Sequence, residues 1–374
     1  MKKFVWPLLI IFFLLGGLAA ILIGQVSLPP EPRPESVEVI SEKWAGSGHA
    51  DQNSLSFTYW DENEPPEVPA TCAKCHSAYG YLSYLGEDGS EPLVVDASFP
   101  IGSVVSCYVC HNPSAHEKEF AIFPSGAEIG DMGSSATCAE CHQGRQSGVS
   151  ISNIITELPV DEVNEDLQFI NVHYNIAAAT QYGTDVTLGY EYPGKEYVGF
   201  FQHVSSYQHC TDCHDAHSLQ ITATDCAACH PMVSEIGNLR DIRMAETPDF
   251  DGDGNATEGI YFELINIHGM LYDAILTYAE EVIGEPIVYA KQFPYWYNDL
   301  NDNGIADEDE VNFGNRYATW TPRLVRATFN YQVVNKDPGG FTHNARYLIQ
   351  IMIDTIEDLT EVVPVETAHL IRPE

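Results

Sequence analysis

All ten cysteines of this 374-residue chain lie in one repeated pentapeptide, Cys-x-x-Cys-His. The pattern occurs five times, as Cys72, Cys75 and His76; Cys107, Cys110 and His111; Cys138, Cys141 and His142; Cys210, Cys213 and His214; and Cys226, Cys229 and His230. We call these five segments pentads one to five. No cysteine is left for a disulfide or a catalytic thiol, so any fold must first accommodate the pentads.

Three kinds of chemistry use a Cys-x-x-Cys pair. A redox dithiol needs a thioredoxin-like context and would not recur five times. Zinc sites use paired cysteines, but histidine follows them less regularly. A histidine directly after the second cysteine is typical of c-type haem attachment, in which two thioethers tether the porphyrin and the histidine ligates the iron. The sequence therefore predicts five covalently bound haem c groups.

The charge of the chain limits its partners. It has 54 Asp and Glu against 17 Lys and Arg, a formal net charge of −37. Nucleic acids and anionic membrane surfaces would be repelled, so neither is an expected partner. Hydrophobic residues make up 44% of the chain, which argues against disorder despite the charge.

The N-terminus predicts export. Two lysines precede an apolar run from Phe4 to Gly24, which is typical of a signal peptide and long enough for a membrane anchor. We assign residues 1–26 to a signal peptide or anchor and residues 27–44 to a proline-rich linker. Membrane contact is expected only through this segment, and the rest of the chain is expected in the periplasm or at the cell surface.

The pentads occupy residues 45–235, which we interpret as a pentahaem domain. Its connecting segments are rich in Gly, Ser, Pro and Asp, as expected where haems replace an apolar core. The predicted fold is mostly α and irregular coil wrapped around a stacked haem chain. A helix is expected within residues 161–182, with His173 on its inner face.

Residues 236–374 hold no pentad and are predicted to be helical. Helices are expected from about Gly259 to Ile283, from Pro322 onward, and from about Thr342 to Leu359. Two acidic, EF-hand-like loops accompany them. One matches the calcium pattern with Asp299, Asn301, Asn303, the Ile305 carbonyl, Asp307 and Glu310. The other offers Asp249, Asp251, Asp253 and Asn255. Its twelfth residue is Ile260, so the closing glutamate is missing unless Glu258 takes its place.

The second ligand of each iron decides what the chain can do. A second histidine makes an iron that exchanges electrons without binding substrate, whereas an open position permits catalysis. Six other histidines are candidate second ligands: His49, His173, His203, His217, His268 and His343. His217 lies three residues beyond His214, so it cannot bind the same iron from the opposite face and is expected to serve a neighbouring haem.

Several segments resemble one protein family. The segments are Ser-Gly-His49-Ala-Asp, the pentads ending in His76, His142 and His214, Asn-Val-His173-Tyr, and Trp320-Thr-Pro-Arg-Leu. They are similar to exported multihaem c-type cytochromes of anaerobic, metal-respiring or syntrophic microbes, over roughly residues 45–360. Some members of that family polymerise into filaments, so the resemblance allows a homopolymer.

Three functions follow from these observations. The first is electron transfer along closely spaced bis-histidine haems, with redox proteins or extracellular acceptors as partners and no catalysis. The second is a nitrite- or hydroxylamine-type reductase with one open haem. Pentahaem nitrite reductases typically attach their catalytic haem through Cys-x-x-Cys-Lys, whereas all five pentads here end in histidine. The third is a calcium-dependent surface assembly protein.

Overall fold

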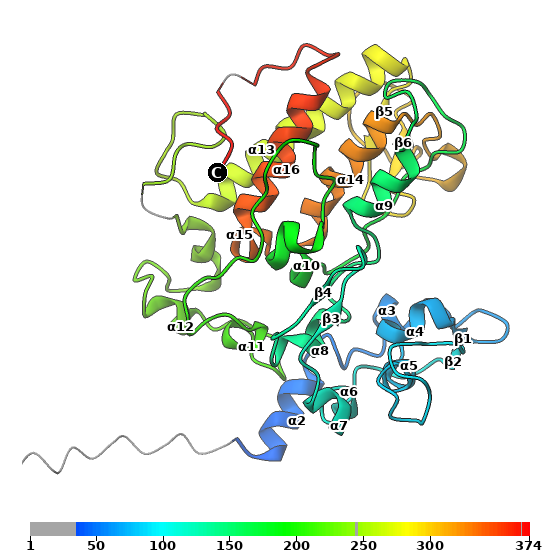
Figure 1. The fold of residues 1–374 in the computed structure, drawn as a ribbon, viewed down its shortest axis with the longest axis vertical. Helices are drawn as coiled ribbons and strands as arrows, with labels where there is room; N and C mark the ends of the chain where they lie inside the picture. Colours follow the sequence, from blue (N-terminus) through cyan, green and yellow to red (C-terminus); the bar gives the residue numbers. More distant parts are fainter. Residues whose placement is uncertain (1–34, 244–245, 368) are drawn as a thin grey trace, which may run out of the picture. The chain divides into compact units, whose positions relative to one another are not determined.

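The computed structural model describes residues 35–243, 246–367 and 369–374, and here the chain is mostly helix and irregular coil (Figure 1). The expected fold class is confirmed at this level. The predicted signal peptide or anchor lies outside the described residues. Within the described part, none of the helices combines the length and apolar character that a membrane crossing requires. Residues 44–374 form one compact unit, which the following paragraphs describe.

Each pentad lies in or beside a short helix. The two cysteines of a pentad are three positions apart in the sequence. Residues with this spacing lie on the same face of a helix, so a single turn presents both thiols together. These helices are α4 (Ala70–His76), α6 (Cys107–Cys110), α8 (Ser135–Ala139), α11 (Cys210–Cys213) and α12 (Ala223–Ala227). In Figure 1 they form a row below the long C-terminal helices, running α12, α11, α8, α6, α4.

Three long helices form the C-terminal part: α13 (Ile260–Tyr278), α14 (Pro322–Lys336) and α16 (Ala345–Leu359). They start and stop at the signals in the sequence. The Thr321 hydroxyl caps α14, whose first residue is Pro322, and the Asn344 side chain caps α16. Helix α13 continues as a π turn, η3 (Ala279–Ile283), and Gly284 closes it in the left-handed conformation. The helices expected here are confirmed, with α16 preceded by a separate turn, α15 (Gly340–His343).

Short elements complete the unit. Three two-stranded antiparallel sheets pair β1 (Glu67–Val68) with β2 (Phe99–Pro100), β3 (Ala121–Ile122) with β4 (Glu128–Ile129), and β5 (Ile287–Tyr289) with β6 (Trp296–Asn298). The remaining helical elements of the unit are α3 (Leu55–Thr58), α5 (Ala78–Tyr84), α7 (Pro113–His116), α9 (Gly148–Ile155), α10 (Ala177–Tyr182), η1 (Gly183–Val186), η2 (Ile236–Asp241) and η4 (Phe313–Asn315). Helix α2 (Val37–Ala45) begins before the unit and ends in its first residues.

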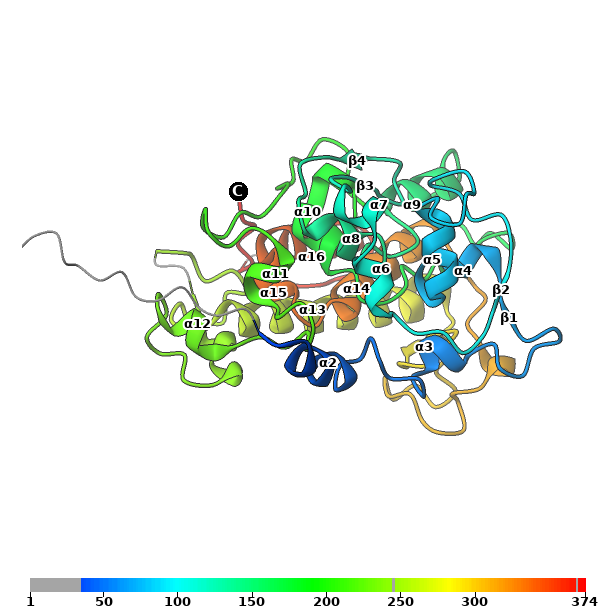
Figure 2. The ribbon, with the colours of Figure 1, turned by 90° about the horizontal axis from the view of Figure 1, so that it is seen from below.

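The main hydrophobic core joins the pentad-bearing segment to the C-terminal helices. Met132 and Ala136, beside pentad three, belong to the same buried cluster as Leu271 of α13, Phe329 of α14 and Ile351 of α16. Helix α13 packs along α16, and both views show the two side by side (Figure 2). This core crosses the boundary expected between residues 235 and 236, so the long helices support the pentads directly.

The helix expected within residues 161–182 is limited to α10, and the preceding residues are coil. His173 and Asn175 have positive φ angles of 86° and 53°, which a right-handed helix cannot contain. The Val172 backbone is instead tied to other segments: its N–H donates to the Gln332 side chain at 3.0 Å, and its carbonyl accepts from the Arg145 N–H at 3.0 Å. These long-range hydrogen bonds outweigh the local helical pattern and turn His173 out of a helical register.

Candidate haem site

One continuous cavity touches all five pentads. Its volume is 2670 Å³, whereas a pocket for one small molecule typically measures about 300–1,000 Å³. Its wall includes Cys75, Cys110, Cys141, Cys213 and Cys229, one cysteine from each pentad. The space is therefore large enough for several sizeable groups, and every pentad has a thiol beside it.

Thiols of different pentads meet along this cavity. The Cys75 thiol donates to the Glu140 carbonyl at 3.6 Å, and the nearby Cys141 lowers the pKa of Cys75 while its own pKa is raised. Cys138 and Cys210 interact in the same way, and here the pKa of Cys210 falls to about 6. Pentad three thus touches pentad one through one cysteine and pentad four through the other.

A buried ion pair also joins pentads one and three. Glu140, between the two cysteines of pentad three, is fully buried. Its carboxylate accepts from the Lys74 ammonium, between the cysteines of pentad one, at 3.0 Å, and from Lys118 at 2.8 Å. The Tyr84 hydroxyl donates to it at 3.0 Å. These partners offset the cost of burying the carboxylate and fix the two pentads relative to each other.

Four pentad histidines each face one histidine from elsewhere in the chain. The ring centroids are separated by 5.9 Å for His76 and His173, 6.2 Å for His111 and His217, 6.3 Å for His142 and His49, and 6.0 Å for His230 and His203. All four partners are among the six candidates from the sequence. Each pair joins segments that the sequence order does not bring together.

This spacing suits a metal between two imidazoles. A ligating nitrogen lies about 2 Å from its metal and about 1 Å from its own ring centre, so two opposed rings should be about 6 Å apart. Rings in direct stacking contact are closer, as the 4.1 Å between His268 and Tyr331 illustrates. The residues present therefore fit bis-histidine haem iron at these four positions.

The protonation of these histidines also suits metal binding. Burial lowers the pKa of His49 to about 4, and the adjacent His142 adds to the effect. Burial likewise lowers the pKa of His173 to about 4. In His76 and His142 the Nδ1 atom is hydrogen-bonded to a backbone carbonyl, of Ser56 at 2.8 Å and of Asn175 at 3.2 Å. This partner places the proton on Nδ1 and leaves Nε2 available as a ligand.

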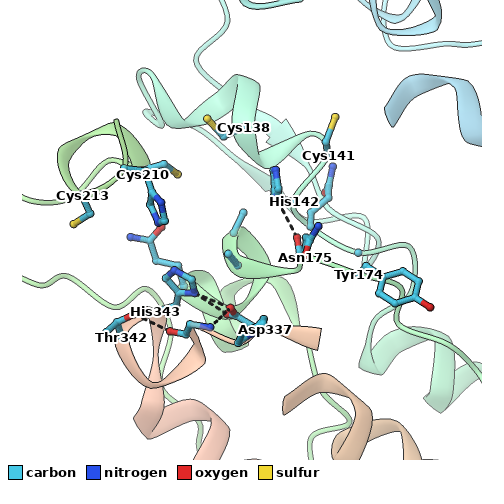
Figure 3. A pocket seen from close by; sticks show the side chains of 18 of the residues that line it. Cys138, Cys141, His142, Tyr174, Asn175, Cys210, Cys213, Asp337, Thr342 and His343 are labelled. Atoms are coloured by element: carbon cyan, nitrogen blue, oxygen red, sulfur yellow. Dashed lines mark hydrogen bonds and ion pairs between the residues drawn. The ribbon is translucent and has the colours of Figure 1, made fainter. Parts of the chain in front are cut away.

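Pentad four has a different neighbour. The His214 Nδ1 is 3.1 Å from the Leu219 carbonyl, and His343 lines the same cavity as His214 and Cys210. The Nδ1 of His343 is 2.7 Å from the Asp337 carboxylate, which is 3% exposed (Figure 3). Gly339 allows this position, because a Cβ there would lie 2.6 Å from the His343 ring.

His268, the sixth candidate ligand, lies elsewhere. Its Nε2 is 2.9 Å from the Tyr331 carbonyl, and its ring stacks on the Tyr331 ring between α13 and α14. Both the nitrogen that would ligate and the ring face are already occupied, so we assign His268 to the helical core rather than to an iron. His268 is buried because it lies in the apolar stripe of α13, as is common for histidines in a helical core.

The loop from Asp299 to Glu310 is closed around its two end carboxylates. Asp299 accepts the Gly304 N–H at 2.7 Å, and Glu310 accepts the N–H groups of Leu300 and Asp307 at 2.7 and 3.1 Å. Gly304 has φ +71°, as the sharp turn requires. Asp299 and Glu310 are both buried, which brings the first and twelfth positions of the motif to the centre of the loop.

The loop that starts at Asp249 has its closing carboxylate at Glu263, which sequence reasoning missed. The Glu263 carboxylate accepts the N–H groups of Phe250 and Asp251 at 2.6 and 2.9 Å, much as Glu310 accepts Leu300. Asp251, Glu258 and Glu263 bring carboxylate oxygens within 4.8 Å of one another, and one Glu258 oxygen is buried without a hydrogen-bond partner. Glu263 lies in the first turn of α13, five residues beyond Glu258, outside the spacing that the motif specifies.

The curated relatives that match this chain are polyhaem cytochromes. C-type polyheme cytochrome OmcB of Geobacter sulfurreducens is 24% identical over 378 aligned residues, and OmcC of the same species is 28% identical over 371. The chain is a distant homologue of polyhaem c-type cytochromes. The alignments cover 82% and 83% of this chain, and the relationship implies covalently bound haem c.

Both relatives are longer than this chain. The chain spans 46% of the length of OmcB and 45% of that of OmcC, so it corresponds to about half of each relative. No protein-family profile matches the chain, and no solved structure matches it.

Proposed function

We propose that this chain transfers electrons outside the cytoplasm through five covalently bound haem c groups, each held between two histidines. The carrying observation is the set of four histidine pairs at 5.9–6.3 Å, in which every pair includes one pentad histidine. The homology to polyhaem cytochromes supports the same assignment. The fifth pair in the proposal is His214 with His343. Bound haem supplies an iron that takes up and releases one electron.

The chain's own residues would set the order in which electrons pass the haem sites and the reduction potential of each site. The thiol contacts of pentad three with pentads one and four support the spatial order one, three, four, five, which differs from the order in the sequence. Pentad two is attached through His217, from the segment that follows pentad four. Nearby carboxylates and bis-histidine ligation favour the oxidised iron, so low potentials are expected.

The ligand assignment predicts a change of spin state in one variant and none in a matched control. Replacing His203 by alanine should leave the iron at pentad five with an open position, so one of five irons should become high-spin. Replacing His268 by alanine should leave all five low-spin. Electron paramagnetic resonance of the oxidised protein, integrated against iron content, measures both.

Two outcomes would contradict the proposal. Five low-spin irons in the His203→Ala protein would remove His203 from the ligand set. A high-spin iron in the unmodified protein that responds to nitrite or hydroxylamine would favour a reductase instead.

We further propose that the two acidic loops bind Ca²⁺. Oxygen-rich loops with a glycine at the turn and a closing glutamate suit this ion, and Glu310 and Glu263 close the two loops. Replacing Glu263 by glutamine should weaken one of two calcium sites by roughly ten- to a hundredfold. Calorimetric titration of chelator-treated protein with Ca²⁺ measures this.

The exposed Glu281, near the end of the same helical segment, provides the control. Glu281→Gln removes the same charge without touching either loop and should leave both affinities unchanged. Equal binding by the Glu263→Gln and unmodified proteins would exclude Glu263 as a ligand.

A further inference from the structure

We infer that Asp337 is a positioning residue that makes the iron site of His214 and His343 more reducing than a site whose histidines bond only to backbone carbonyls. The inference rests on the proposed function, because it concerns the ligands of one of the proposed irons. It assigns a role to a buried carboxylate that lies outside the pentad pattern.

The geometry is that of a carboxylate bonded to a ligand histidine. Both Asp337 oxygens lie near the His343 Nδ1, at 2.9 and 2.7 Å. Asp337 follows the last residue of α14, and His343 ends α15, so two helix ends hold the pair. The Gly339 N–H donates to Asp337 at 3.1 Å, which fixes the carboxylate in the turn between the helices. Figure 3 shows this pair next to pentads three and four.

The buried Asp337 carboxylate has partners for both of its oxygens. They lie 2.9 and 2.7 Å from the His343 Nδ1, and the Gly339 N–H donates to one of them. Within the described residues, no lysine or arginine is ion-paired with Asp337. Its negative charge is therefore directed at His343 rather than neutralised by a separate cation.

Three other rings of the ligand set have neutral partners. His76, His142 and His214 each bond through Nδ1 to a backbone carbonyl, at 2.8, 3.2 and 3.1 Å. The His343 Nδ1 instead bonds to the Asp337 carboxylate. The His343 ring therefore has a charged partner, whereas these three rings have neutral ones.

A carboxylate in this position changes the iron in a known direction. By accepting the Nδ1 proton strongly, it raises the basicity of Nε2 and so strengthens the donation of electrons to the metal. In a buried setting its charge is weakly screened and favours the oxidised iron, which carries one more positive charge. Both effects lower the reduction potential of the His214–His343 site.

The test is a potentiometric titration of the complete protein, followed by optical absorbance and by electron paramagnetic resonance. In Asp337→Asn, one of the five one-electron waves should move to a higher potential by at least about 59 mV, which corresponds to a tenfold change in the redox equilibrium constant of that site. The haem content and the five low-spin signals should not change. Asp337→Glu keeps the charge but displaces the carboxylate, so the same wave should move in the same direction by less.

Glu191→Gln is the matched control. Glu191 is a half-buried carboxylate that accepts from the Tyr347 hydroxyl and the Thr184 hydroxyl, both at 2.9 Å, and it is not among the described residues that line the cavity. Its loss should leave every wave in place. If Asp337→Asn or Asp337→Glu retains five low-spin haems and no wave rises, the inference is wrong. If the unmodified protein lacks five low-spin irons, the proposed function itself fails, whatever the variants show.

Discussion

Replacing Cys138 and Cys141 together by serine is expected to remove one haem and to destabilise the whole pentad-bearing segment. Pentad three has thiol contacts with both pentad one and pentad four, and its Glu140 anchors Lys74. Loss of a large group from the middle of the cavity would leave space that the surrounding residues cannot refill, and such cavities are costly. Haem per chain, by pyridine haemochrome assay, and the melting temperature measure the two effects.

Pentad two offers a matched comparison. Cys107 and Cys110 are exposed, so Cys107→Ser with Cys110→Ser should also remove one haem but lower the melting temperature far less. Five haems in the pentad-three variant would contradict covalent attachment there. Equal loss of stability in the two double variants would contradict the central position of pentad three.

Replacing Arg323 by methionine is expected to lower the free energy of unfolding by about 3–5 kcal/mol. The Arg323 side chain is 3% exposed and pairs with Asp358 at 2.6 Å and with Asp161 at 2.7 Å. Without it, Arg326 is the remaining cationic partner of Asp358 within the described part of the chain, and burial already raises the pKa of Asp358. A buried carboxylate that loses a cationic partner is one of the costliest defects in a folded protein. Denaturant titration followed by circular dichroism measures the loss.

Arg316→Met is the control for this change. Arg316 is exposed and rests on the Phe313 ring, 4.8 Å from its centre, so the expected change is within about 0.5 kcal/mol. A loss for Arg323→Met as small as that for Arg316→Met would mean that the buried ion pairs contribute nothing net.

Local signals in the sequence predicted the helical part of the fold well. Thr321 followed by Pro322, and Gly284 after a long apolar pattern, marked helix ends that the structure confirms. The same reasoning failed at residues 161–176, where His173 adopts a positive φ angle. There, hydrogen bonds to residues distant in the sequence determine the backbone, and no local pattern reports them.

The candidate site shows the same division. Spacing within each pentad sets two thiols on one helical face with a histidine beside them, because three residues make nearly one helical turn. The partner of each pentad histidine does not follow from this spacing, because it comes from another segment: His49 meets His142, and His217 meets His111. His268 had the same apolar helical setting that a ligand would have, yet it stacks on Tyr331.

The sequence by itself determined which groups are available to this chain: five cysteine pairs, each followed by a histidine, and six further histidines as candidate partners for them. Only the tertiary structure decided which histidine faces which pentad, that pentad three touches pentads one and four, and that Glu263 closes the first acidic loop. The physical reason is range. Helical geometry acts over three or four residues, whereas the histidine pairs join residues that are between 27 positions (His203 and His230) and 106 positions (His111 and His217) apart.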